Sequence, residues 1–180
     1  MSKTSLLVSM IVLGLAGAAD AGGQAGSLGV GAEYQLSGIG GASVIYDAGQ
    51  FHVGGALGFE DPPGGNNTVF ELAGEFYYHV HHSAFADFGI GGSLGVASVP
   101  APTMMAPDAR ATDVYLQPGF QIRVFLSSNV ALSASGGMVI GVVDASGVSI
   151  SGQNVGASGQ NAAAGTPAFR GGVGIHYYFY

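Results

Sequence analysis

The chain has 180 residues, a formal net charge of -7 and only 8% charged residues, against roughly 25% in an ordinary soluble domain. The acidic balance argues against nucleic acid as a partner, because phosphate binding needs clustered Lys and Arg, and the absence of cysteine excludes a disulfide framework or a thiolate metal site. The mean hydropathy of +0.41 suggests a membrane protein, yet beyond the N-terminus no run of about 18 apolar residues is present to form a transmembrane helix.

Residues 1–21 have the organisation of a cleavable secretory signal peptide. Lys3 supplies a positive start, residues 6–18 form the apolar segment, and Ala19 and Ala21 are the small residues that a signal peptidase requires. Because the apolar run is short for a membrane span, cleavage is favoured over an uncleaved anchor helix. We therefore expect an exported chain whose folded domain covers residues 22–180.

The rest of the sequence alternates bulky apolar residues with small or polar ones, and this period of two predicts β-strands. Eight strands are expected, and the first two have the weaker patterns. In chain order they cover residues 27–36, 41–48, 50–60, 68–82, 84–98, 113–126, 130–142 and 170–179. Pro118 interrupts the sixth of these strands, and since proline cannot donate to a ladder we expect a β-bulge at Pro118–Gly119.

The connections between the strands alternate in length. Tight turns are expected at 48–50, 82–83 and 127–129, and long connections at 60–68, 99–110 and 145–166. Among the connections at the long-loop end, only the early one near 37–41 is expected to be short. Short turns at one end and long loops at the other are typical of a bacterial outer-membrane barrel. Strands of about 9–11 residues suffice to cross the membrane when tilted.

The alternation leaves open which side of the sheet faces outward. A soluble barrel would hold the bulky apolar side inside and expose a surface of Gly, Ser and Ala with very few charges, which water solvates poorly. Eight strands enclose an interior only just wide enough for side chains, which suits the small and polar side. Aromatic residues near both strand ends match the two girdles of a membrane barrel. We therefore expect the apolar side to face lipid.

The pattern resembles the small eight-stranded outer-membrane β-barrel family that includes OmpA and OmpX. Gly174, Tyr177 and Phe179 match the closing-strand signal of that family, although Tyr180 adds one residue beyond the final outward aromatic. The resemblance implies that barrel-assembly machinery recognises these residues. The fold expected is all-β: a closed, antiparallel, eight-stranded up-and-down transmembrane barrel. It closes by pairing of the last strand with the first, since an unpaired edge is not viable in lipid.

Seven charged residues lie on the small-residue side and are expected to form a charge network in the lumen: Glu33, Glu71, Glu75, Asp87, Asp113, Arg123 and Arg170. Because buried charges need partners, a salt-bridged plug is predicted. Arg123 is expected near Asp87, and Arg170 near Glu33, or near Glu71 or Glu75 across the interior. The alternative is a narrow gated pore in which an arginine exchanges carboxylate partners.

The histidines raise the questions of metal binding and of catalysis. His79 and His81 are two apart on one strand and are expected to face the same way, so they could chelate a metal; polar filling of the lumen mouth is the simpler interpretation. His81, His82 and Ser83 form the only close Ser/His group and have no evident acid nearby. The sequence therefore assigns no catalytic residue, no metal and no cofactor, and predicts that the protein is not an enzyme.

These patterns together predict a monomeric barrel in the outer membrane of a Gram-negative cell, with lipid as its surroundings. Its role is expected to be structural or to lie in surface interactions through the long loops, where Met104 and Met105 are candidate contacts for a partner that the sequence does not identify. The alternatives are a narrow gated porin-like channel and a soluble periplasmic ligand-binding barrel.

Overall fold

The computed structural model describes residues 24–38, 40–61, 68–100, 109–143, 147–150 and 169–180. The expected signal peptide and most of the three long connections lie outside these residues. Within them, no helix is long and apolar enough to cross a membrane.

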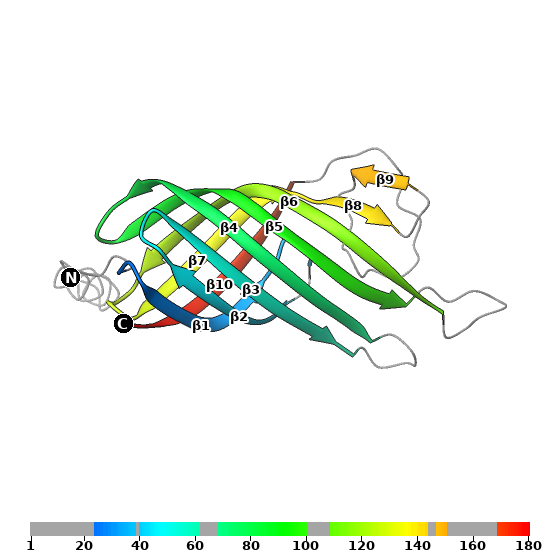
Figure 1. The fold of residues 1–180 in the computed structure, drawn as a ribbon, viewed down its shortest axis with the longest axis horizontal. Coiled ribbons are helices and arrows are strands. Elements are labelled where there is room, and N and C mark those ends of the chain that lie inside the picture. The colour runs from blue at the N-terminus through cyan, green and yellow to red at the C-terminus, as the bar shows by residue number, and fades with distance from the viewer. Residues whose placement is uncertain (1–23, 39, 62–67, 101–108, 144–146, 151–168) are drawn as a thin grey trace, which may run out of the picture.

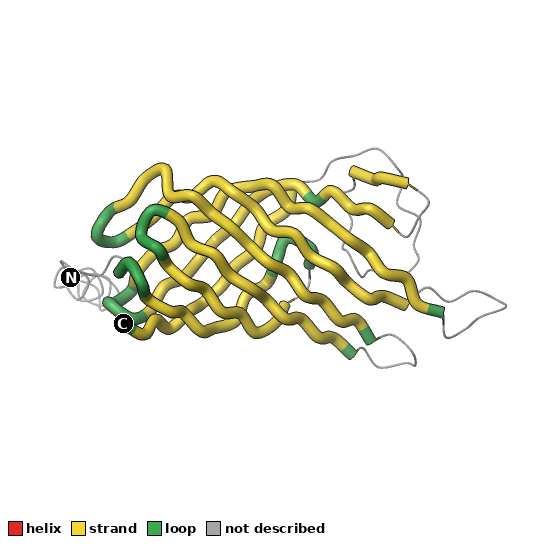
Figure 2. Tube along the Cα trace, viewed as in Figure 1, coloured by secondary structure: helices red, strands yellow, loops and turns green. Residues whose placement is uncertain are grey.

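The described chain forms a closed antiparallel barrel (Figure 1). Its strands are β1 (Ser27–Tyr34), β2 (Gly40–Asp47), β3 (Phe51–Glu60), β4 (Val69–His82), β5 (Ala86–Pro100), β6 (Arg110–Phe125), β7 (Val130–Met138), β8 (Ile140–Val143), β9 (Gly147–Ile150) and β10 (Phe169–Phe179). Successive strands pair from β1 to β7, β7 pairs with β10, and β10 pairs with β1 to close the barrel. Figure 2 shows how strongly the strands tilt around the barrel axis.

The barrel wall has eight strands because β7 and β8 together form one of them. They pair with successive parts of β6. Gly119 pairs with Gly137 on β7, and Leu116 pairs with Ile140 on β8, in the same register. β9 then folds back on β8 and lies outside the barrel wall. The predicted eight strands and the closing pair are confirmed, whereas β9 falls in the segment 145–166 that was expected to be loop throughout.

The predicted bulge at Pro118–Gly119 is wrong. Gly92 pairs with Pro118 and Gly91 with Gly119 without a shift of register. On the other side of β6, pairing stops between Gly119 and Leu116, opposite the break between β7 and β8. Proline has no N–H to donate, and here the neighbouring strand accommodates that loss by interrupting its pairing instead of adding a residue.

The bulky apolar side of the sheet faces outward, as the composition predicted. Leu94, Leu72 and Ile90 are more than half exposed in the isolated chain, whereas Ala73, Ser93 and Gln117 on the opposite side are buried. Outward aromatic residues pair near the two ends of the barrel, as with Phe51 opposite Tyr78 and Phe59 opposite Phe70. An outer face of this kind is suited to acyl chains.

The two ends of the barrel differ. The turns 48–50, 83–85 and 126–129 and the C-terminus lie at one end, which we call the turn side (Figure 1). The strand ends that flank the long connections, at Glu60, Val69, Pro100 and Arg110, lie at the other end, the loop side. Gly49 has a φ of +87°, a left-handed conformation that favours glycine, and its N–H donates to Asp47 Oδ1 at 2.7 Å. This turn therefore brings the Gly49 carbonyl and the Asp47 carboxylate together at the lumen mouth.

Candidate functional site

Arg123 on β6 is the centre of the turn-side half of the lumen. Its side chain is 2% exposed, and Nη2 lies 2.6 Å from Asp87 Oδ2 and 2.7 Å from Asp47 Oδ2. Asp87 is the register partner of Arg123 on the adjacent strand β5, whereas Asp47 belongs to β2 on the far side of the barrel. The guanidinium therefore bridges the lumen.

Two aromatic side chains complete the surroundings of this guanidinium. Arg123 Nη1 donates to the Tyr178 hydroxyl at 3.1 Å, and Cζ lies 5.4 Å from the centre of the Phe125 ring, within cation–π range. Arginine suits the position because its rigid fork of donors can satisfy several acceptors at once. One side chain thus connects β2, β5 and β10.

A chain of histidines continues from Arg123, and its geometry determines the ring tautomers. His79 Nδ1 lies 2.8 Å from the Gly49 carbonyl, which can only accept, so Nδ1 carries the proton. His79 Nε2 must then accept, and both Arg123 Nη2 at 3.1 Å and His52 Nδ1 at 2.8 Å lie within reach of its single lone pair. His52 Nε2 lies 4.0 Å from Glu75 Oε1, which is beyond hydrogen-bond distance. The turn side is therefore a connected polar network and not a set of isolated ion pairs.

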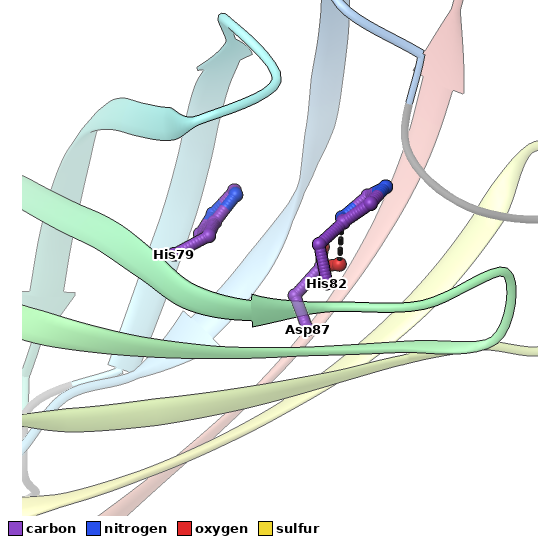
Figure 3. Close-up of side chains that lie close together, drawn as sticks. All are labelled: His79, His82 and Asp87. Carbon is purple, nitrogen blue, oxygen red and sulfur yellow. Dashed lines mark ion pairs between the residues drawn. The ribbon is translucent and has the colours of Figure 1, made fainter.

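The structure corrects the expected orientation of the histidines. His79 pairs with Gly89 but His81 pairs with Phe88, so β4 contains a bulge between them. The extra residue turns His81 to the exposed side and brings His82 opposite Asp87, whose Oδ1 its Nδ1 contacts directly. His79 and His82, rather than His79 and His81, therefore lie on the side of Asp87 (Figure 3). A period-two pattern cannot reveal a bulge, because the extra residue reverses the alternation.

The loop-side half of the lumen is organised differently. Glu71 accepts from Ser37 Oγ at 2.9 and 3.1 Å and from the Tyr115 hydroxyl, so two neutral hydroxyl groups bind this buried carboxylate. Around it lies an apolar cluster of Leu36, Val69, Ala97, Val99, Tyr115 and Val139. Gly95 has no room for a side chain, since a Cβ there would overlap the Tyr115 hydroxyl.

The structure places the seven predicted lumen charges at different depths. Glu33, Glu71, Glu75, Asp87 and Arg123 are buried, and Asp113 and Arg170 are partly buried. Arg123 and Asp87 are in contact. Arg170 lies opposite Gly137 on β7, toward the loop side, and its pairing with Glu33, Glu71 or Glu75 stays a prediction.

Several residues of the network were missed at the level of sequence. Asp47 shares the inward alternation of Ser43, so its burial could have been anticipated from the pattern of 41–48. Tyr178 and His52 also lie on the inward side, but which charged group they contact depends on the register and shear of the closed barrel. Ser37 lies just beyond the end of β1, where strand periodicity gives no information.

The three residues of the closing-strand signal lie on β10. Tyr177 and Phe179 face outward, with their rings 5.1 Å apart and edge to face, and Gly174 pairs with Glu33 and Ser133 in the two adjacent strands. The outward aromatics are accessible from the membrane side of the barrel. Recognition of these residues by assembly machinery stays a prediction.

A closed eight-stranded antiparallel barrel with an apolar outer face and a polar, densely filled interior is the architecture of the small OmpA- and OmpX-like barrels. A search of solved structures agrees: the chain is similar to the N-terminal β-barrel domain of Pseudomonas aeruginosa OprF, with a TM-score of 0.53 over 88% of this chain and 99% of that one. The sequence identity is 11%, so the likeness is one of fold. No protein-family model matches the chain, and no curated protein matches it.

Proposed function

We propose that this protein is a monomeric outer-membrane barrel of a Gram-negative cell, with a closed lumen, and that it anchors long surface loops. The observation that carries this proposal is the burial of large side chains in the lumen: Arg123, Phe125, Tyr178, His52 and His176 are each at most 2% exposed. A side chain beside a water-filled passage would retain accessible surface. Their burial therefore supports a plug at this level and argues against an open channel.

The outward apolar band supports the membrane location. Burying such residues stabilises by about 25 cal/mol per Å² of surface removed from water, and here acyl chains supply that burial. The soluble periplasmic alternative would require the same leucines and phenylalanines to fill the interior. Because they face outward, a water-soluble state would expose a large continuous apolar surface.

Hydrogen bonds at the loop side support a role in presenting loops. Arg110 Nε donates to Ser98 Oγ at 3.0 Å, and its Nη2 donates to the carbonyls of Thr68 and Ser98 at 2.7 and 2.9 Å. Thr68 Oγ1 donates to Asp61 Oδ1 at 2.9 Å across the base of the first long loop. These bonds tie the bases of the loops 60–68 and 99–110 to each other, so that the barrel would hold both in a defined arrangement.

Planar-bilayer recording tests the closed lumen. We expect the folded wild-type protein to give no discrete conductance steps. Regular steps that change in Arg170→Ala would support the narrow gated channel and contradict the plug.

Fractionation tests the location and the fold. We expect the protein in the outer-membrane fraction, with faster gel migration before heating than after it. An epitope inserted within 151–168 should bind antibody on intact cells. Recovery in the aqueous periplasmic fraction, or labelling only after permeabilisation, would contradict the proposal.

The closing strand gives a test of assembly in cells. Phe179→Ala should reduce the amount of folded barrel in the membrane while leaving refolding into detergent micelles close to wild type, because machinery is needed only in the cell. The matched control is Phe59→Ala, an outward aromatic at the loop side. An equal loss in both variants would mean that Phe179 contributes only as an ordinary membrane-facing aromatic.

A further inference from the structure

Three side chains with metal-ligating atoms meet at the turn-side mouth of the lumen. One atom from each of His79, His82 and Asp87 lies within 4.8 Å of the other two (Figure 3). Two imidazoles and a carboxylate are a donor set that Zn²⁺ and similar divalent transition metals prefer. We propose that these three residues bind one such ion, with solvent completing its coordination.

The bulge in β4 is what creates this set of ligands. Along a regular strand, residues 79 and 82 would point to opposite faces of the sheet. The register shift between His79 and His81 places His82 opposite Asp87 instead, on the same side as His79. Bulges often re-aim a side chain next to a functional site. Here the bulge interrupts the regular hydrogen-bond ladder and brings a second imidazole to the carboxylate.

His79 already has the hydrogen bond that a metal-binding histidine requires. Its Nδ1 donates to the Gly49 carbonyl at 2.8 Å, which leaves Nε2 unprotonated and fixes the plane of the ring. Metal-ligating histidines usually donate their other N–H to a carbonyl or a carboxylate in this way. Binding through Nε2 would use the lone pair that His52 Nδ1 and Arg123 Nη2 share in the absence of a metal.

The site is accessible and its charge favours a cation. His79 and Asp87 are buried, but the His82 side chain is 49% exposed and opens the cluster to solvent. The positive Arg123 opposes a metal ion here, yet the two carboxylates Asp47 and Asp87 both lie against it, so these three groups together carry one negative charge. Tetrahedral zinc holds its ligand atoms about 3.4 Å apart, and the half-exposed His82 ring has the freedom to close that gap.

Zinc binding can be measured on the folded protein in detergent micelles. Equilibrium dialysis with Zn²⁺ alone should show one bound ion per chain. The variants His82→Gln and Asp87→Asn should each weaken binding by at least about tenfold, consistent with loss of a ligand. His81→Gln is the matched control, because His81 is adjacent in sequence but turned away by the bulge, and it should bind as wild type does.

Absence of stoichiometric binding in the wild type, or an equal loss in His81→Gln, would overturn the proposal. Heat-shifted migration confirms that each variant is folded. Should Asp87→Asn fail to fold through loss of its pair with Arg123, Co²⁺ on the wild type decides the matter. Visible absorption bands of a nitrogen- and oxygen-ligated ion that disappear on adding Zn²⁺ support the site, and a spectrum identical to that of free Co²⁺ contradicts it.

Discussion

The two halves of the lumen hold buried carboxylates in different ways. On the turn side, Asp47 and Asp87 are bound by the fully charged Arg123, whereas on the loop side Glu71 is bound by the hydroxyl groups of Ser37 and Tyr115 within an apolar cluster. Removing one member of a buried ion pair leaves an uncompensated charge, but removing a neutral donor leaves the carboxylate with its other partners. Removing a buried partner on the turn side should therefore lower the free energy of unfolding more than removing one on the loop side.

The largest effect is expected from Arg123→Met. This change leaves two buried carboxylates without their cation, and it should lower the free energy of unfolding by about 3–5 kcal/mol. Urea titration of the folded barrel in lipid or detergent measures the loss. Arg110→Met, at the exposed rim, is the control and should lose no more than about 1 kcal/mol.

Further substitutions in the Arg123→Met variant separate the effect of charge from that of hydrogen-bond geometry. When Asp47→Asn and Asp87→Asn are added to Arg123→Met, no uncompensated charge remains, so much of the lost stability should return. A triple variant no more stable than Arg123→Met alone would show that the loss of stability comes from hydrogen-bond geometry and not from charge.

A smaller effect is expected from Tyr115→Phe on the loop side. The substitution removes the hydroxyl that donates to Glu71 but keeps the ring in the apolar cluster. The expected loss is about 1.5–3 kcal/mol, as for a hydrogen bond to a charged group, and the same urea titration measures it. A loss as large as that of Arg123→Met would remove the distinction between the two halves.

The smallest effect is expected from Val139→Ala, which touches only the apolar part of the loop side. Two methylene equivalents are removed from a buried position, for a loss of roughly 1–2 kcal/mol. Because no charge is involved, unfolding at low and at high salt should show the same difference between variant and wild type. A difference that changes with salt would mean that Val139 shields the Glu71 group.

The fold could be predicted from the sequence because alternation and turn spacing are local properties. The outward leucines and the inward side of the strands, apart from the end of β4 beyond its bulge, follow from a period of two and from the lack of surface charge. The closing of β10 on β1 follows from the cost of an unpaired strand edge in lipid. The contacts inside the lumen could not be predicted to the same degree. Asp47 meets Arg123 only because shear brings β2 and β6 to the same level, and His82 faces Asp87 only because one residue is inserted at the bulge.

Pro118 shows a further limit of reasoning from one strand. Its missing N–H predicts an irregularity, but whether β6 itself bulges or its neighbour interrupts its pairing depends on the partner strand. The break between β7 and β8 is the outcome here, and no feature of 113–126 alone distinguishes it from a bulge.

The apolar side of this barrel is expected to face lipid, and its interior is expected to be closed to water. Since the chain has no cysteine, single cysteines at successive positions 70–77 of β4 can carry a spin label without background. We expect collisions with lipid-dissolved oxygen to rise at the outward positions 70, 72, 74 and 76, and the inward positions to be protected from both oxygen and a water-soluble nickel reagent. Strong collisions of the nickel reagent with labels at the inward positions would contradict an interior closed to water. Stronger collisions with nickel than with oxygen at the outward positions would contradict an outer face in lipid.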